Sequence, residues 1–292
     1  MADDSRVLKS TPATITGTFL DQYGEPAAPS GTVTVAVAAA DGSEVIPAGT
    51  ATSAGAGTGE FTVALTAAQV AELDVYTATW TASSGEVAVS WHEIVAGYYS
   101  SVEALRAQST VLQDHVKYPD AALRVARQLV EEEFEGICGQ SFVPRFRRAR
   151  LEVHSASQLV LPEPRLLRVL SVHGESRDGT LTAMDSSTVA AIRSDEVGVA
   201  RVAGSWPGPA VIVQWVAGFQ RPPPDVLGAY FTRVRDVANR DRRGVPDRAS
   251  TFTAADNGGT YSLLVPGMRG AVTGIPDVDV VLGRFDVEAL IR

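Results

Sequence analysis

The sequence predicts an α+β protein: an N-terminal β-sandwich followed by a helical domain with a β-rich insertion. Its 292 residues suggest about two domains at roughly 150 residues per domain. Apolar residues alternate with period 2 in the first third, whereas two later segments carry apolar stripes of helical spacing. Residues 1–100 hold two basic and eleven acidic residues, so they account for the whole formal net charge of −9, while the remainder is balanced. We therefore place the domain boundary near residue 97.

Five alternating runs define the predicted sandwich, which covers residues 11–96 after a flexible polar arm at residues 1–10. The runs lie at residues 15–19, 33–37, 61–65, 76–80 and 87–91, with turn-forming Gly, Asp and Ser residues between them. Thr66 and Gln69 have the spacing of a capping box, which predicts a short helical turn.

The segment from Asp74 to Ala78 resembles the immunoglobulin-like sandwich, in which a tyrosine starts the penultimate strand and its hydroxyl pins the preceding corner. Tyr76 takes that place here, and Ala78 stands where antibody domains have a cysteine. The resemblance implies an appended module that packs on neighbours or decorates a surface. Carbohydrate binding is the alternative, although its two candidate platforms, Trp80 and Trp91, are expected on buried faces.

Two helices are predicted in the second domain, residues 97–292, after a short one that Ser101 caps. The first begins at Pro119 and ends at Gly139, with its apolar stripe at Leu123, Ala126, Val130, Phe134 and Ile137. Arg124, Arg127, Glu131 and Glu135 lie off the stripe, and residues 131–133 are expected to form a solvated acidic face. The second helix opens at residues 222–225, and Gly244 is expected to end it. Its expected buried stripe is Leu227, Tyr230/Phe231, Val234 and Val237/Ala238.

Short strands are predicted between these helices, near residues 150–153, 159–161, 166–172, 198–202 and 210–216. After the second helix, residues 245–273 read as a long loop with two isolated aromatic residues, Phe252 and Tyr261. The closing residues 275–285 have little sequence left to pack against, which favours docking onto another chain.

The sequence lacks the usual signatures of catalysis and cofactor binding. Its four histidines are scattered, and its single cysteine, Cys138, lies near a helical apolar stripe, so we expect a core thiol and no zinc site. Residues 55–59 lack the Lys-Ser/Thr of a phosphate loop, and no serine stands in Gly-x-Ser-x-Gly. We expect no enzyme, cofactor, metal, secretory signal or membrane span, and the lone cysteine fits a reducing cytoplasm.

Two arginine clusters stand out in the second domain. Arg145, Arg147, Arg148 and Arg150 surround Phe146, and a second group begins at Arg233 in the later helix. Because the domain balances at zero charge and has no nucleic-acid motif, we favour structural or protein-interface salt bridges over DNA contact.

The order of several segments resembles the head-to-tail adaptor (head–tail connector) proteins of long-tailed bacteriophages. These segments, across about residues 97–292, are residues 98–100, the helix from Tyr118-Pro119-Asp120 through residues 134–145, the helix opening at 222–225, and residues 245–252 and 274–285. The N-terminal sandwich departs from the minimal pattern of that family and reads as an appendage.

The resemblance implies a structural virion protein at the head–tail junction, made in the host cytoplasm. It would form a ring, typically of twelve subunits, between the portal and the next neck, head-closure or tail protein. Genomic DNA would pass through the lumen without sequence-specific binding. The implied portal-docking segment is residues 275–292, with Val278, Val281, Leu282, Arg284 and Phe285. Phe252 and Tyr261 lie in a loop that would order on assembly, and Arg145, Arg147, Arg148 and Arg150 are candidates for an interface or channel. The alternative is a carbohydrate-binding or surface-decoration module on a helical scaffold.

Overall fold

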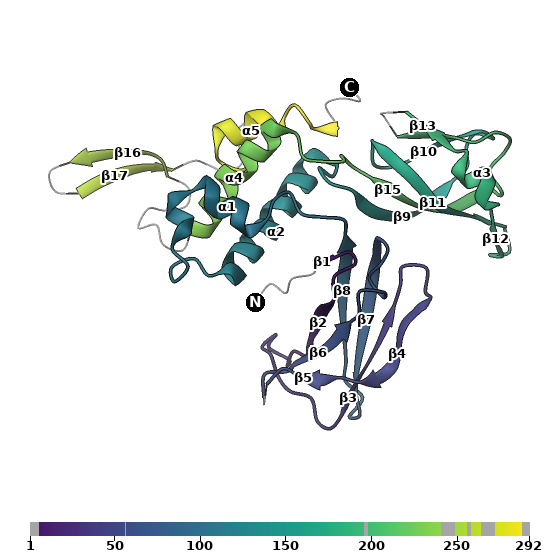
Figure 1. The fold of residues 1–292 in the computed structure, drawn as a ribbon, viewed down its shortest axis with the longest axis horizontal. Helices are drawn as coiled ribbons and strands as arrows, with labels where there is room; N and C mark the ends of the chain where they lie inside the picture. Colours follow the sequence, from purple (N-terminus) through teal and green to yellow (C-terminus); the bar gives the residue numbers. More distant parts are fainter. Residues whose placement is uncertain are drawn as a thin grey trace. The chain divides into compact units, whose positions relative to one another are not determined.

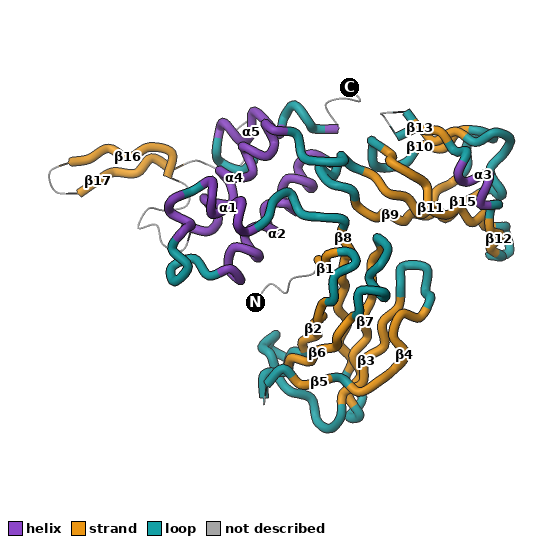
Figure 2. The backbone as a smooth tube through the Cα atoms, viewed as in Figure 1, coloured by secondary structure: helices purple, strands orange, loops and turns teal. Residues whose placement is uncertain are grey.

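A computed structural model describes residues 6–55, 57–195, 198–240 and 272–287, together with the backbone of residues 249–255 and 258–263. The chain divides into two compact units (Figure 1). The first comprises Met1–Gly97 and Val143–Gly218, and the second comprises Tyr98–Phe142 and Phe219–Arg292. Strands dominate the first unit and helices dominate the second, so the described chain is a mixed α and β protein (Figure 2).

Residues 6–97, here called the N-terminal module, form two sheets around one apolar core. One sheet has the strand order β1-β8-β7-β3-β4 and the other the order β2-β6-β5. Tyr76 lies in this core, and its hydroxyl donates to the carbonyl of Gln69, as predicted. The predicted capping box is also confirmed, because the amide of Thr66 donates to Gln69 Oε1 at 2.8 Å. The strands are β1 (Arg6–Leu8), β2 (Ala13–Thr18), β3 (Val33–Ala38), β4 (Glu44–Thr50), β5 (Thr52–Ser53), β6 (Glu60–Leu65), β7 (Asp74–Ala82) and β8 (Val87–Val95).

The prediction of a flexible arm at residues 1–10 is wrong for its second half. Arg6–Leu8 form β1, which pairs in parallel with Glu93–Val95 of β8. The side chain of Arg6 also donates to Glu93 Oε2 at 3.0 Å, which anchors the strand. Residues 1–5 of the predicted arm lie outside the described residues.

The two tryptophans of the N-terminal module differ from each other in burial. Trp80 is fully buried, as predicted, and it occupies space that a Cβ atom on Gly17 would enter, at 2.2 Å from Trp80 Nε1. Trp91 is 64% exposed, so the prediction of a buried face is wrong for this residue. The inward face of β8 consists instead of the intervening residues, among them Ser90 and His92, and Ser90 Oγ accepts a hydrogen bond from the Trp80 indole.

The rest of the first unit carries the predicted short strands. A four-stranded sheet has the order β12-β11-β15-β9, and a three-stranded sheet has the order β10-β14-β13. Their core includes Val172, Val211, Val213 and Trp215. The elements are β9 (Arg145–Glu152), β10 (Gln158–Val160), β11 (Leu166–Glu175), β12 (Leu181–Ala183), α3 (Ser186–Ala190), β13 (Arg193–Ser194), β14 (Val199–Arg201) and β15 (Ala210–Ala217).

The second unit contains the predicted helices. Ser101 caps the first by accepting from the amide of Ala104, and Gly139 ends α2 in the left-handed conformation with φ of 62°. The expected stripe of α2 is buried, with Ile137 only partly so. In α4 the buried face is shifted toward Val226, Ala229 and Arg233. The helices are α1 (Val102–Gln108), the 3-10 turn η1 (Thr110–Gln113), α2 (Asp120–Cys138), α4 (Pro224–Asn239) and α5 (Pro276–Leu282).

The segment predicted as a long loop contains a β-hairpin. β16 (Ala249–Ala255) pairs in antiparallel register with β17 (Gly258–Leu263). Small Ser, Thr and Ala residues favoured the loop interpretation. Each strand nevertheless contains one aromatic residue, and these two residues, Phe252 and Tyr261, stand opposite each other in the register. The predicted helix end at Gly244 lies outside the described residues.

Candidate functional site

An aromatic cluster joins the segments that enter, cross and close the second unit. The ring of Phe142 lies 5.9 Å from Tyr99, 5.4 Å from Phe219 and 5.5 Å from Phe285, measured between centroids. Tyr230 of α4 extends the cluster, with its centroid 5.3 Å from that of Tyr99. Aromatic pairs at these separations add to the stability that area burial supplies. The cluster therefore holds together four segments that are far apart in the sequence.

The closing segment is largely packed on its own chain, which corrects the expectation that it lacks partners. Val278 and Leu282 are each 1% exposed, and Val281 and Phe285 are half-buried. Cys138 Sγ donates to the carbonyl of Leu282 at 3.6 Å, and the side-chain amide of Gln140 donates to the carbonyl of Phe285. These partners come from the end of α2, which is distant in the sequence from the closing segment, so the neighbouring residues alone did not predict them.

Val280 and Arg284 are among the side chains of this segment that still face solvent and can contact another protein. Val280 is 61% exposed, on the side of α5 opposite Val278 and Leu282. The side chain of Arg284 is also mostly exposed, and its guanidinium lies 3.9 Å from Asp225 at the start of α4. An ion pair this exposed contributes little to stability, so Arg284 is available for a partner's carboxylate.

Residues 131–133 were predicted to form a solvated acidic face, and this is wrong for two of the three. Glu131 is fully buried and accepts from the amide of Tyr99 at 2.8 Å. Glu133 accepts two hydrogen bonds, of 2.8 and 2.7 Å, from the guanidinium of Arg233 in α4. One turn before Glu131, the guanidinium of Arg127 lies 3.3 Å from the centroid of the Tyr98 ring. Arg127, Glu131 and Glu133 of α2 thus make internal contacts, whereas Glu132 is exposed as predicted.

Arg233 and Arg106 act as cross-links within the helical unit. Arg233 also donates to Asp236 at 2.9 Å. Burial disfavours the charge of Arg233, but its bonds to Glu133 and Asp236 outweigh this and raise its pKa. Arg106 is buried and donates to the carbonyls of Leu112 and Tyr118 and to Asp120, whose pKa the hydrogen bond from Arg106 lowers. Sequence reasoning missed Arg106, because a single arginine on a short helix gives no signal of its distant partners.

The arginine cluster around Phe146 lies on the edge strand β9. Arg145 is fully buried and donates to the carbonyl of Gly97 at 3.3 Å, so its guanidinium cannot line a channel in this structure. Arg147 donates to Glu163 at 2.6 Å and lies 3.4 Å from Glu93. Arg150 pairs with Glu175, and Arg148 is exposed. Three of the four arginines therefore make contacts inside the first unit.

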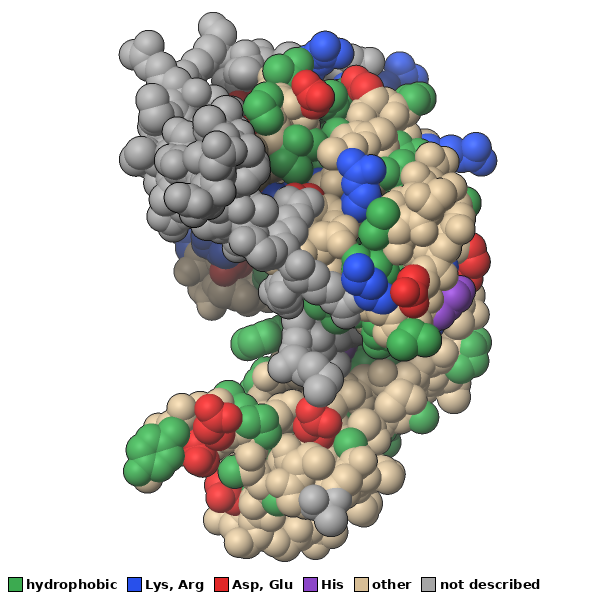
Figure 3. Space-filling view, turned by 90° about the vertical axis from the view of Figure 1, so that its left-hand side faces the viewer, with side chains coloured by type: hydrophobic (Ala, Val, Ile, Leu, Met, Phe, Trp, Pro, Cys, Tyr) green, Lys and Arg blue, Asp and Glu red, His purple; other side chains and the backbone are tan. Residues whose placement is uncertain are grey.

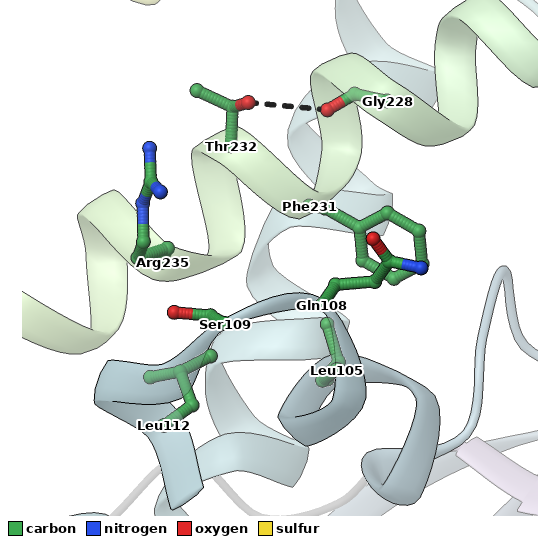
Figure 4. A pocket seen from close by; sticks show the side chains of 8 residues that line it. All are labelled: Leu105, Gln108, Ser109, Leu112, Gly228, Phe231, Thr232 and Arg235. Atoms are coloured by element: carbon green, nitrogen blue, oxygen red, sulfur yellow. Dashed lines mark hydrogen bonds between the residues drawn. The ribbon is translucent and has the colours of Figure 1, made fainter.

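The helical unit also holds a small pocket between α1, η1 and α4, with a volume of about 190 Å³. Figure 4 shows Leu105, Ser109 and Leu112 reaching it from one side, and Phe231, Thr232 and Arg235 from α4. The Thr232 hydroxyl donates to the carbonyl of Gly228 at 3.2 Å. Arg235 is the one charged side chain in its lining, so the pocket contains no acid–base pair.

Other candidates for chemistry can be placed as well. Cys138 is fully buried, and burial, with a smaller effect from Asp286, raises the pKa of its thiol to about 12, as suits a core residue. Among the residues that the structure describes, no three His, Cys, Asp or Glu side chains gather in a way that could hold a metal ion. No helix in the described part of the chain is long and apolar enough to span a membrane. Phe252 and Tyr261 pair in the hairpin register, and their side chains lie outside the described structure.

Comparison with known proteins gives distant structural matches. No family model matches the sequence, and no curated protein matches it significantly. One similar solved structure is the neck of an empty GTA particle computed with C6 symmetry, with a TM-score of 0.42 and 15% identity, covering 64% of this chain and 89% of that one. Another is the neck of a native GTA particle computed with C12 symmetry, with a TM-score of 0.40 and 16% identity, covering 65% and 93%. TM-scores of this size, at such identities, do not by themselves establish a shared role.

Proposed function

We propose that this chain is a structural protein of the neck of a phage-like particle, a head-to-tail adaptor that forms a ring between the portal and the next neck or tail protein. The observation that carries the proposal is the meeting of the resembling segments in one core. Tyr99, Phe142, Tyr230 and Phe285 come from four of those segments, and their rings are in contact within the helical unit.

The adaptor acts by assembly, without a chemical step. Apolar surface and charged groups between neighbouring copies close the ring, and the lumen lets DNA pass without base-specific contacts. Val280 on the outward side of α5 and Arg284, two residues after this helix ends, are the residues of the closing segment that we assign to portal contact. The buried Val278 and Leu282 hold α5 in place for that contact.

The experiment is co-purification with the cognate portal, compared between wild type and Val280→Asp. Removal of residues after Gly274 is not a suitable test, because it would strip the core of Val278 and Leu282. We expect Val280→Asp to lose portal binding and Val116→Asp, at a 95% exposed valine after η1, to retain it. Equal binding by both variants contradicts the docking assignment. Electron microscopy of particle necks that lack this chain between portal and tail contradicts the adaptor function.

The exposure of Trp91 keeps carbohydrate binding as a second candidate. Trp80, Trp206 and Trp215 are buried, so Trp91 is the one solvent-exposed tryptophan of the four in the chain. Iodide should therefore quench mainly Trp91. Carbohydrate binding is supported if neutral oligosaccharides such as maltohexaose or chitohexaose protect the protein from iodide quenching and this protection is lost in Trp91→Ala. Iodide quenching that no glycan of a panel changes contradicts it.

A further inference from the structure

One edge of the five-stranded sheet is open over most of β8. β1 covers this edge only at Glu93–Val95, and no described strand pairs with it from Val87 to His92. The amide of Lys9 donates to the carbonyl of Val95 at 2.9 Å, so the backbone of Val95 points to this edge. Because strand residues alternate in direction and the β7–β8 register has no shift, Val87, Val89 and Trp91 direct their N–H and C=O groups to the same edge.

The side chains along this open edge are apolar and exposed. Val87 is 58% exposed and Val89 is 45% exposed, and Trp91 continues the row. The opposite edge of the sheet is different: β4 contains Glu44 and Pro47, and its pairing with β3 has register shifts. Charges, proline and irregular pairing are the usual protection of an edge against strand addition. β8 has none of them from Val87 to Trp91, so this edge is suited to accept a strand.

A groove lies beside the open edge and gives an incoming strand a place to seat its side chains. Its volume is about 550 Å³. Residues 86–89 form one wall, and residues 18–21 and 27–29 form the other. Asp21 and Glu86 lie in this lining, and the N-terminal module as a whole carries the net negative charge. Acidic side chains are visible on this module in Figure 3. The groove therefore favours a strand flanked by basic residues.

The same chain contains a strand pair, β16 and β17, that is flanked by basic residues in the sequence. β16 and β17 form a separate two-stranded sheet with no third described strand. A two-stranded hairpin alone is marginally stable in water, and a third strand stabilises it. The surrounding sequence is basic: residues 240–269 contain five arginines and three aspartates, and four of the arginines precede β16. Two acidic N-terminal modules would instead repel each other, which disfavours direct pairing of two β8 edges.

We propose that strand β16 of one copy adds to the open β8 edge of a second copy, so that neighbouring subunits are joined by a continued β-sheet. Backbone hydrogen bonds would supply affinity, as in other cases of strand addition. The contact is head-to-tail, because the donor and acceptor surfaces differ, and contacts of this type build a ring when the rotation between neighbouring copies closes. The inference rests on the proposed ring function and assigns its subunit contact.

Disulfide trapping between two full-length variants tests the contact. One chain carries Val89→Cys, and the other, enlarged by a tag, carries Thr251→Cys, Thr253→Cys or Ala255→Cys, one at a time. Cys138 is fully buried and stays in place. A disulfide forms only where the two Cα atoms approach within roughly 4.4–6.8 Å. We expect a mixed, tag-shifted dimer from at least one pair after mild oxidation. The matched control replaces Val89→Cys with Thr50→Cys on the protected edge strand β4 and should give background yield.

Each outcome separates the strand addition from the adaptor function. Mixed dimers at the control level for all three positions overturn the inference. A second variant, Val89→Lys, should abolish rings in electron micrographs while leaving the circular dichroism spectrum unchanged; intact rings would also overturn it. If wild-type protein forms rings but no mixed disulfide forms, the strand addition is contradicted and the adaptor function is not. If the mixed disulfide forms but the protein does not bind the portal, the subunit contact is supported and the adaptor function is contradicted.

Discussion

The backbone N–H of Tyr99 donates a hydrogen bond of 2.8 Å to the carboxylate of Glu131, which is fully buried in α2. The bond joins the segment that enters the helical unit to the middle of its longest helix. A buried carboxylate is tolerated only when its oxygens have partners, so the position of Tyr99 and the burial of Glu131 depend on each other. Arg127, one turn earlier in α2, stacks on the neighbouring Tyr98 ring and reinforces the same junction.

Replacement of Glu131 by alanine should therefore destabilise the protein strongly. Loss of the acceptor leaves a buried N–H unpaired and opens space in the interior, and we expect a cost of about 3 kcal/mol in the free energy of unfolding. Urea denaturation followed by circular dichroism measures it. The adjacent Glu132 is exposed and serves as the control, where alanine should change stability by less than about 0.5 kcal/mol. Equal effects at the two positions would contradict the role of Glu131.

Arg233 should tolerate lysine only partly. Its guanidinium makes two parallel bonds to Glu133 and a third to Asp236, a geometry that the single ammonium of lysine cannot reproduce. We expect Arg233→Ala to cost about 3 kcal/mol, because it leaves partly buried carboxylates without their cation, and Arg233→Lys to cost less. Thermal unfolding of both variants beside Arg235→Ala, a change at an exposed arginine two positions away, checks the order. A stability of Arg233→Lys equal to wild type would contradict the bidentate contribution.

Local patterns predicted most of the helices and strands. The cap at Ser101, the left-handed Gly139 and the stripe from Leu123 to Phe134 are properties of neighbouring residues, and each is found as predicted. The same holds for β15 and for the hydroxyl of Tyr76 at its corner. Such signals need no knowledge of distant contacts, which is why a single sequence contains them.

The errors arose where distant residues decide the environment. Glu131 looked solvated because its partner Tyr99 comes from another segment. The closing segment looked unpartnered because the residues that cover it, at the end of α2, are distant in the sequence. Trp91 looked buried because Val87, Val89 and Trp91 form the more apolar alternating set of β8, yet the other set turns inward, where Ser90 accepts from the Trp80 indole of the neighbouring strand. Of the five predicted portal-docking residues Arg284 is therefore the exposed one, and Val280, which was not among the five, joins it as a candidate.

Removal of the Tyr76 hydroxyl should weaken the N-terminal module without changing its fold. In Tyr76→Phe the ring still fills the core, but the carbonyl of Gln69 loses its donor, so we expect a loss of about 1 kcal/mol. The matched control is Tyr23→Phe, because Tyr23 is 80% exposed. Urea unfolding followed by tryptophan fluorescence, to which Trp80 and Trp91 of this module contribute, measures the change. A midpoint unchanged by Tyr76→Phe would show that the corner bond does not stabilise it.

Acid should destabilise the protein through His92. Burial lowers the pKa of His92 from 6.5 to about 4 in the folded protein, where its Nε2 lies 2.9 Å from Ser90 Oγ, which in turn accepts from the indole of Trp80. Since the unfolded chain binds the proton more tightly, the contribution of neutral His92 is complete above pH 6.5 and is lost as the pH falls toward 4, by about 3 kcal/mol at most. His92→Gln does not titrate, so the difference in unfolding free energy between the variant and wild type should move in favour of the variant across this range. A His92→Gln difference that is constant from pH 7 to 4 would contradict a neutral buried imidazole.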